Sequence, residues 1–265
     1  MSAESTNDLT EIFVTSGDQP KPATNPNYLR LYGHHLCPFV EKARLALAAR
    51  NVVYQNCEID LSNKTEWHVA INGGFVPVLE FPDGTIIHES KVIMEYAEEA
   101  YPDQGYSTLP DDPVEKAQLR LASLIIDQVQ AAYYPMYMKK FGFDDNDLKN
   151  LKEKLQKVED LLAQRQNESG FAWGTENPTQ LDIHLYPLMS RLQYMRGSAF
   201  NEHIAERIDP ETNYPRIIRL VEAIRNREEF KNAVTQKIPQ HSIIQKLVEL
   251  PEGQRLSLSL PVKFE

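Results

Sequence analysis

Residues 28–51 read YLRLYGHHLCPFVEKARLALAARN, and the fold is predicted from the strand, loop and helix that this stretch indicates. Its first five residues, 28–32, alternate in character, as is typical of a short strand. Pro38 follows, at the first helical position, which proline favours. Small and apolar side chains then recur at helical spacing over residues 40–48, and Asn51 suits a left-handed helix end. We therefore expect a strand, a tight loop and a helix.

The residues that follow extend this pattern into a small mixed sheet. We predict a strand at 52–59, a helix at 61–71, two strands at 76–81 and 85–88, and a helix at 89–100. The Asp83-Gly84 pair between the last two strands is a hairpin turn signature. The order β-α-β-α-β-β-α predicts a parallel crossover, then an antiparallel hairpin, then a closing helix. Together these elements form an α/β domain.

Composition divides the chain into five segments. Residues 1–27 are polar and contain several prolines, so we expect a flexible leader, and residues 28–101 form the α/β domain. Residues 102–113, with three prolines and a glycine, predict a linker. Residues 114–250 are predicted to be all-helical, and residues 251–265 form a tail without an assigned structure. The helices are expected at 114–138, 145–167, 181–196, 217–224 and 242–250.

The composition disfavours several classes of function. Lys and Arg number 28 against 38 Asp and Glu, so the net charge is −10 and a nucleic-acid partner is not expected. No apolar run reaches the ~18 residues that a membrane span needs, and the N-terminus lacks the apolar region of a secretory signal. The two cysteines, Cys37 and Cys57, have neither a disulfide-framework nor a metal-ligand spacing. We expect a reducing, metal-free, cytoplasmic setting.

Cys37 is the predicted reactive residue. A thiol at the beginning of a helix faces the positive end of the helix dipole and backbone N–H groups, which stabilise a thiolate. Such a position lowers a cysteine pKa from ~8.5 into the range ~3.5–7.5. The neighbouring His34 and His35 could assist. The alternative is a buried structural cysteine, which is disfavoured by the place of Cys37 between a strand and a helix.

The second cysteine of a dithiol pair is missing. Val40 stands where a Cys-x-x-Cys oxidoreductase has its resolving cysteine, so a mixed disulfide on Cys37 would need an external thiol for its resolution. Cys57 belongs to the strand predicted at 52–59. Its alternation with Ile59 indicates a place in the core rather than a redox role.

An ordered set of motifs resembles glutathione transferases, and the Cys-Pro-Phe trio resembles the omega class in particular. The motifs are Leu36-Cys37-Pro38-Phe39, Leu61 to Trp67, Val76 to Leu79, Glu89-Ser90, Leu109 to Pro113 and the helix cap Thr179 to Asp182. The resemblance covers about residues 28–235, and the ordered set is more specific than any single motif. It implies a thioredoxin-like, glutathione-binding domain followed by an all-α domain, which is the glutathione transferase fold.

The resemblance implies roles for the residues around the thiol. Cys37 is the catalytic residue, and Phe39 forms part of the wall between the thiol and an open acceptor site. Val76 precedes Pro77, a proline that is cis in the family, so the Val76 backbone pairs with the cysteinyl part of glutathione. A cis bond would not have been predicted from the residues alone, because only ~5–6% of X–Pro bonds adopt it.

Three further residues are implied to bind the charged ends of glutathione. Ser90 and the first backbone N–H groups of its helix hold the γ-glutamyl carboxylate. Glu89 meets the ammonium group, and Lys64 pairs with the glycine carboxylate. Taken without the resemblance, Glu89-Ser90 is better explained as a helix cap and Lys64 as a solvated surface lysine.

The helical domain supplies the candidates for the acceptor site. Tyr133 and Tyr137, on the helix predicted at 114–138, and Arg191, on the helix predicted at 181–196, are expected to line its far side. Core packing or a dimer face is an equally good account of the tyrosines.

The implied function is that of a glutathione-dependent thioltransferase and dehydroascorbate reductase with weak conjugating activity. Glutathione is the co-substrate, the acceptors are small electrophilic, disulfide or oxidised compounds, and a homodimer is expected. The alternative is a non-enzymatic scaffold, ligandin or intracellular chloride channel-like protein on the same fold. The charged residues Glu41, Lys42 and Arg44 after Cys37 argue against a membrane-inserting helix and favour the enzyme.

Overall fold

The computed structural model describes residues 9–138, 143–194 and 204–235. The helix predicted at 242–250 and the tail at 251–265 lie outside the described residues. The described chain forms two compact units, of which the first ends at Gly105 and the second begins at Tyr106. This division lies within the stretch predicted as a linker.

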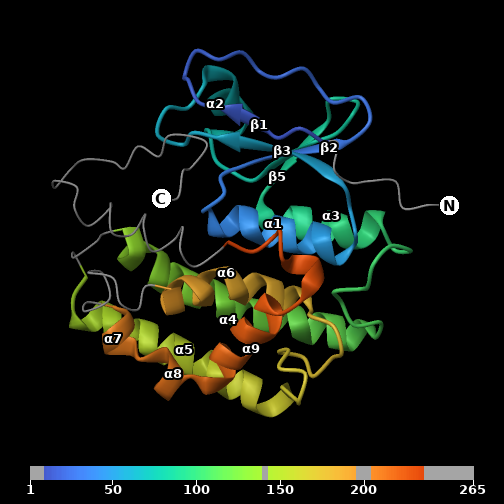
Figure 1. Ribbon diagram of the computed structural model, residues 1–265. Coiled ribbons are helices and arrows are strands. Elements are labelled where there is room, and N and C mark those ends of the chain that lie inside the picture. The colour runs from blue at the N-terminus through green and yellow to red at the C-terminus, as the bar shows by residue number, and fades with distance from the viewer. Residues whose placement is uncertain (1–8, 139–142, 195–203, 236–265) are drawn as a thin grey trace. The chain divides into compact units, whose positions relative to one another are not determined.

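The first unit is built on a five-stranded mixed sheet (Figure 1). Its elements are β1 (Ile12–Val14), β2 (Leu29–Gly33), α1 (Pro38–Ala49), β3 (Tyr54–Ile59), α2 (Glu66–Asn72), β4 (Val78–Glu80), β5 (Ile86–His88) and α3 (Ser90–Ala100). The strand order is β1-β3-β2-β4-β5, with β3 parallel to β1 and β2, and β4 antiparallel to β2 and β5. From β2 onward, the predicted order β-α-β-α-β-β-α and the thioredoxin-like arrangement are confirmed.

Helix α2 is shorter than the helix predicted at 61–71. It begins at Glu66 because Thr65 caps it: the Thr65 hydroxyl oxygen accepts a hydrogen bond from the backbone N–H of His68 at 3.3 Å. It ends at Gly73, whose φ of 78° places it in the left-handed region that glycine adopts without a steric penalty. Residues 61–64 therefore form a loop, and Lys64 lies on that loop.

The N-terminal segment contains a strand where a flexible leader was expected. Ile12 in β1 pairs with Cys57 in β3, and the backbone carbonyl of Gln19 accepts a hydrogen bond from the indole of Trp67 at 3.0 Å. The three residues of β1 are too few to stand out in a polar sequence. They are ordered because β3 would otherwise present an open edge of unpaired backbone groups, and β1 covers that edge.

A buried network of polar side chains ties this segment to the sheet. Arg30 donates hydrogen bonds to the carbonyl of Ala23 at 2.6 Å and to the Glu80 carboxylate at 3.2 Å. The Tyr32 hydroxyl donates to the same carboxylate at 2.8 Å. Glu80 is almost completely buried. A buried charge is tolerated only when it is paired and hydrogen-bonded, and these contacts satisfy Glu80.

The two faces of the sheet are covered by different helices (Figure 1). Helices α1 and α3 pack against each other on one face, and α2 lies on the other. Cys57 belongs to the cluster on the α2 side, together with Tyr32 and Ile59, against which Trp67 and Ile71 of α2 pack. Because side chains alternate along a strand, Glu58 faces the opposite side, toward α1. The predicted place of Cys57 in the core is confirmed.

The described part of the second unit is helical (Figure 1). It contains α4 (Pro113–Met138), α5 (Asp145–Arg165), α6 (Gln180–Tyr194), α7 (Ala205–Ile208), α8 (Pro210–Asn213), α9 (Pro215–Arg225) and a short 3-10 helix (Glu228–Phe230). Helix α4 packs against α5 and α6, and α9 packs against α5 and α6. The one-turn helices α7 and α8 were not predicted because four residues are too few to show helical periodicity. Among the described helices, none is both long enough and apolar enough to cross a membrane.

The beginning of α6 is held by a buried carboxylate. Asp182 accepts hydrogen bonds from the backbone N–H of Thr179 at 2.7 Å, from the Thr179 hydroxyl at 2.7 Å and from the backbone N–H of Ala172 at 2.6 Å. Burial raises the pKa of Asp182 to about 6, so at pH 7 the group is an ionised acceptor. The predicted cap of this helix is confirmed, and it also anchors the preceding loop.

Replacing this acceptor should be costly. We expect Asp182→Ala to lower the free energy of unfolding by about 2–4 kcal/mol, because buried donors would lose their acceptor. The matched control is Asp147→Ala, which removes the exposed carboxylate that accepts from the backbone N–H of Asp144 at 3.2 Å in the capping box of α5, and it should cost about 0.5–1 kcal/mol. Urea unfolding of both variants measures the difference. Equal losses would show that burial does not make the α6 cap special.

Candidate functional site

Cys37 lies between β2 and α1, at the N-cap of the helix. Its φ and ψ are −73° and 122°, its backbone N–H donates to the carbonyl of His34 at 2.9 Å, and its own carbonyl accepts from Glu41 at 3.1 Å. Pro38 follows as the first helical residue, and the Cys37 side chain is half-buried. The thiol therefore sits at the positive end of a helix dipole, where a negative charge is stabilised.

A buried ion pair holds the loop that leads into Cys37. Glu58, on β3, accepts a hydrogen bond from the backbone N–H of His35 at 2.6 Å and pairs with Arg44 of α1 at 2.8 Å. Arg44 also donates to the carbonyl of His35 at 3.4 Å. Both backbone groups of His35 are thus held by one ion pair whose side chains are almost fully buried. Glu58 was not singled out from the sequence, although an acidic residue in a largely buried strand could have drawn attention to it.

His34 contributes to the same loop as a neutral hydrogen-bond acceptor. Its Nδ1 accepts from the backbone N–H of Leu36 at 3.3 Å, and the side chain is buried. Burial lowers the pKa of His34, with Arg44 acting in the same direction and Glu58 against it. At neutral pH the ring is therefore uncharged. It can help the thiol by fixing the loop, but it does not supply a positive charge.

Phe39 and Lys42 form a cation–π contact on the first turn of α1. The Lys42 ammonium lies 5.1 Å from the centroid of the Phe39 ring. Lys42 is buried and Phe39 is half-buried. The aromatic ring next to Cys37 is therefore held in place by a partner on its own helix.

The register of the sheet brings the other predicted residues to the same end. In the antiparallel pair of β2 and β4, Tyr32 faces Val78, so Val76 and Pro77 lie opposite the end of β2 and the residue that follows it. In the pair of β4 and β5, Val78 faces His88, so the same two residues also lie beside those that follow β5. The Val76–Pro77 peptide bond is cis, as the resemblance implied.

Glu89 and Ser90 begin α3 immediately after β5. Glu89 is the N-cap, and its φ of 73° is in the left-handed region that non-glycine residues rarely adopt. Backbone strain of this kind clusters at functional sites, where the surrounding structure imposes it. The Glu89 side chain is 74% exposed, whereas Ser90 is buried. A solvent-exposed carboxylate, 3.8 Å from Nδ1 of His88, thus stands beside a helix N-terminus.

Lys64 reaches the same end of the sheet from the loop before α2. Its ammonium lies 5.2 Å from the centroid of the Phe75 ring, one residue before Val76. The stem of Lys64 passes so close to Gly74 that a Cβ at that position would approach Lys64 Cδ to 2.8 Å. A glycine with positive φ is therefore required at position 74 for this placement of the lysine.

Cys57 is not part of this arrangement. No disulfide joins it to Cys37. Its side chain is fully buried on the α2 side of the sheet, and burial raises its pKa to about 12. At neutral pH Cys57 therefore remains a thiol, which is a poor nucleophile compared with a thiolate.

The residues predicted to line the acceptor site belong to the helical unit, and those whose side chains are described are buried. Tyr133 on α4 is 1% exposed and Arg191 on α6 is 2% exposed. Arg191 donates a hydrogen bond to the carbonyl of Pro187 at 2.6 Å. The side chain of Tyr137 lies outside the described residues. The burial of Tyr133 and Arg191 favours core packing over an open acceptor wall.

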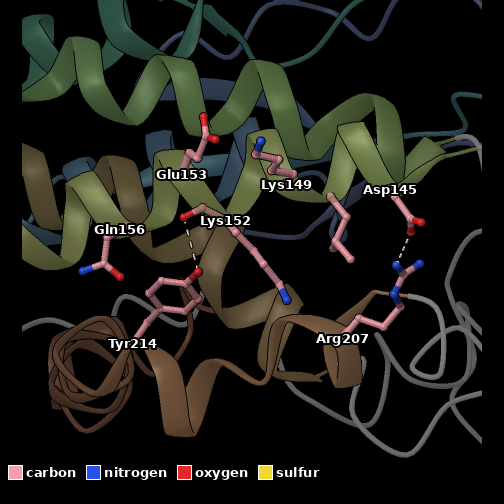
Figure 2. A pocket seen from close by; sticks show the side chains of 8 residues that line it. Asp145, Lys149, Lys152, Glu153, Gln156, Arg207 and Tyr214 are labelled. Atoms are coloured by element: carbon pink, nitrogen blue, oxygen red, sulfur yellow. Dashed lines mark hydrogen bonds and ion pairs between the residues drawn. The ribbon is translucent and has the colours of Figure 1, made fainter.

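The helical unit contains a separate surface pocket of about 530 Å³ (Figure 2). It lies beside α5 and is lined by residues of that helix together with Arg207 and Tyr214. Arg207 pairs with Asp145, and the Tyr214 hydroxyl donates to the carbonyl of Lys152 at 3.3 Å (Figure 2). None of the predicted site residues lines this pocket, and its charges are of both signs. It is not the thiol site.

Known proteins resemble this chain in both sequence and fold. Residues 31–105 match the family described as glutathione S-transferase, N-terminal domain. Glutathione S-transferase omega-1 of Sus scrofa is 30% identical over 189 residues, which cover 71% of this chain and 76% of that protein.

Two solved structures support the fold assignment. A trimeric glutathione transferase of Leishmania has a TM-score of 0.73 at 22% identity over 83% of this chain; the match spans about half of that longer chain, 48%. Glutathione transferase Omega 1C of Trametes versicolor has a TM-score of 0.67 at 24% identity, covering 84% of this chain and 97% of that one.

The matched N-terminal domain includes the end of the sheet at which Cys37, the cis Val76–Pro77 bond and the Glu89-Ser90 turn lie. The similarity to the Sus scrofa protein continues into the helical unit. By its sequence and its fold, this chain belongs to the omega class of glutathione transferases.

Proposed function

We propose that the protein is a monothiol glutathione-dependent thioltransferase and dehydroascorbate reductase, with Cys37 as its catalytic residue. The observation that carries the proposal is the position of Cys37 at the N-cap of α1, in a loop clamped by Glu58 and Arg44. That position favours the thiolate, which is the reactive form in disulfide exchange.

Glutathione binds beside this thiol in the proposed scheme. The backbone of Val76 pairs with the cysteinyl part of glutathione. This pairing is supported by the sheet register, which places the cis Val76–Pro77 peptide opposite the end of β2, next to the loop that leads into Cys37. Ser90 and the N-terminus of α3 hold the γ-glutamyl carboxylate. The exposed Glu89 carboxylate meets the ammonium group, and Lys64 pairs with the glycine carboxylate as a point charge.

The chemistry consists of two exchanges. The Cys37 thiolate attacks the glutathione sulfur of a mixed disulfide, which releases the acceptor as a thiolate and leaves Cys37 joined to glutathione. The thiolate of a second glutathione then attacks the glutathione sulfur of that adduct, which gives oxidised glutathione and restores Cys37. With dehydroascorbate, two glutathione molecules supply two electrons and two protons, and the products are ascorbate and oxidised glutathione.

A cysteine at this position favours reduction over conjugation. A tyrosine or serine hydroxyl stabilises a bound glutathione thiolate without reacting with it, whereas a cysteine exchanges with glutathione and forms a covalent bond. Conjugating activity should accordingly be weak. The acceptors in this scheme are small electrophilic, disulfide or oxidised compounds.

We further propose a cytoplasmic homodimer. A reducing compartment keeps Cys37 available, and Cys57 needs no oxidising one. Val114, Leu121 and Leu124 of α4 are exposed by more than half of their surface. Large apolar side chains gathered on one helix are typical of a surface that a second chain covers.

Removing the reactive sulfur should abolish thiol transfer. We expect Cys37→Ala to lose glutathione-dependent reduction of a small mixed disulfide and of dehydroascorbate, whereas Cys57→Ser keeps the larger part of both activities. A coupled assay that follows oxidised glutathione measures both variants. If Cys57→Ser alone lost activity, the monothiol scheme would be wrong. If wild type were inactive although it bound glutathione, a scaffold or binding role on the same fold would replace the proposal.

The two thiols should also differ in reactivity. Iodoacetamide at pH 7.5 is expected to add one group to the native chain, at Cys37, and two groups after denaturation. The reason is that Cys57 is fully buried and its pKa is raised to about 12 by burial, so very little thiolate exists at that pH. Mass spectrometry of the digested protein locates the label. Rapid labelling of Cys57 in the native chain would contradict the assignment.

A further inference from the structure

The peptide that leads into Val76 is held on both sides by α2. The backbone N–H of Phe75 donates to the side-chain oxygen of Asn72 at 3.1 Å, and the carbonyl of Phe75 is 3.1 Å from Nε2 of His68. His68 is fully buried, whereas the Phe75 side chain is 68% exposed. The exposed loop is therefore anchored through its backbone to two side chains of one short helix.

The protonation state of His68 follows from its partner. A carbonyl oxygen only accepts hydrogen bonds, so Nε2 must carry the proton and donate it to Phe75. Burial lowers the pKa of His68; the hydrogen bond to Phe75 acts against this and the nearby Lys64 acts with it, so the ring is neutral at pH 7. Its Nδ1 is a buried acceptor without a hydrogen-bond partner in the described part of the chain.

A buried histidine with an unsatisfied nitrogen lowers the stability of the fold, so it is a poor choice for a residue that serves only to fill space. An unsatisfied buried nitrogen carries a desolvation cost, which an apolar ring of similar size would avoid. The feature that an apolar ring could not provide is the Nε2 hydrogen bond. The adjoining residues need such an anchor, because Gly73 and Gly74 both have positive φ and glycine gives the chain wide conformational freedom.

We propose that His68 is a positioning residue for glutathione. By holding the Phe75 carbonyl it fixes the backbone of Val76, which binds the cysteinyl part of the tripeptide, and keeps the Phe75 ring under Lys64. The inference rests on the proposed glutathione site. It adds a residue that touches neither glutathione nor Cys37 and acts through the Phe75–Val76 peptide.

Two substitutions at position 68 separate the hydrogen bond from the shape of the ring. His68→Phe keeps an aromatic ring and removes the donor, and His68→Gln places an amide N–H about as far along the side chain as Nε2. Titration calorimetry with reduced glutathione should show about a tenfold rise in Kd for His68→Phe, as expected for one lost hydrogen bond that orders a loop. His68→Gln should stay within about threefold of wild type.

A second readout distinguishes positioning from general damage. The rate at which iodoacetamide alkylates Cys37 without glutathione should be the same in all three proteins, because the Cys37 loop is held by Glu58 and Arg44 rather than by α2. Asn72→Ala removes the other anchor of Phe75 from the end of α2, and it should raise Kd in the same direction even if His68→Phe folds poorly.

Wild-type affinity in His68→Phe or in Asn72→Ala would overturn the inference, and so would equal losses in His68→Phe and His68→Gln. A wild-type protein that does not bind glutathione at all would instead contradict the proposed function.

Discussion

The buried ion pair between Glu58 and Arg44 is the interaction on which the thiol site depends. Two charges taken out of water are tolerated only if they are paired and their remaining hydrogen-bonding capacity is used. Here Glu58 accepts a hydrogen bond from the His35 N–H, and Arg44 donates one to the His35 carbonyl. The ion pair therefore joins β3, α1 and the loop before Cys37. The position of the thiol at the beginning of α1 is therefore set by electrostatics in the core as well as by the local chain.

The rest of the candidate site follows from the topology of the sheet. Strand β4 lies between β2 and β5 and is antiparallel to both, so the residues before β4 adjoin the residues after both neighbours. This register alone gathers the Cys37 loop, the Val76–Pro77 peptide and the Glu89-Ser90 turn. Lys64 joins them from the loop before α2, whose position is in turn supported by the N-terminal segment through Gln19 and Trp67. The segment before β2 is thus part of the domain that carries the site.

Much of the fold could be predicted from the sequence because its determinants are local. Helical spacing after Pro38, the Asp83-Gly84 turn and the Thr179 to Asp182 cap each specify a nearby piece of backbone. The three-residue strand β1 could not be predicted, because its stability comes from the open edge of β3 rather than from its own residues. The same holds for α7 and α8, which are single turns supported by tertiary packing.

The candidate site was predictable to the extent that its residues belong to motifs. Cys37, Lys64, Glu89 and Ser90 were proposed from their sequence context and the resemblance. Glu58 and His68 were missed, since what makes them significant is a partner distant in the sequence or a backbone group on a loop. Tyr133 and Arg191 were proposed as acceptor residues but are buried, because the helical pattern alone does not say which face of a helix is covered.

The most direct test of the central claim is the mass of the protein after incubation with oxidised glutathione. Attack of the Cys37 thiolate on that disulfide gives a mixed disulfide on the protein and one glutathione thiolate. We predict one glutathionyl group per native chain, located on Cys37 by peptide mapping and removed by reduced glutathione. An unmodified protein, or a glutathionyl group on Cys57, would contradict it.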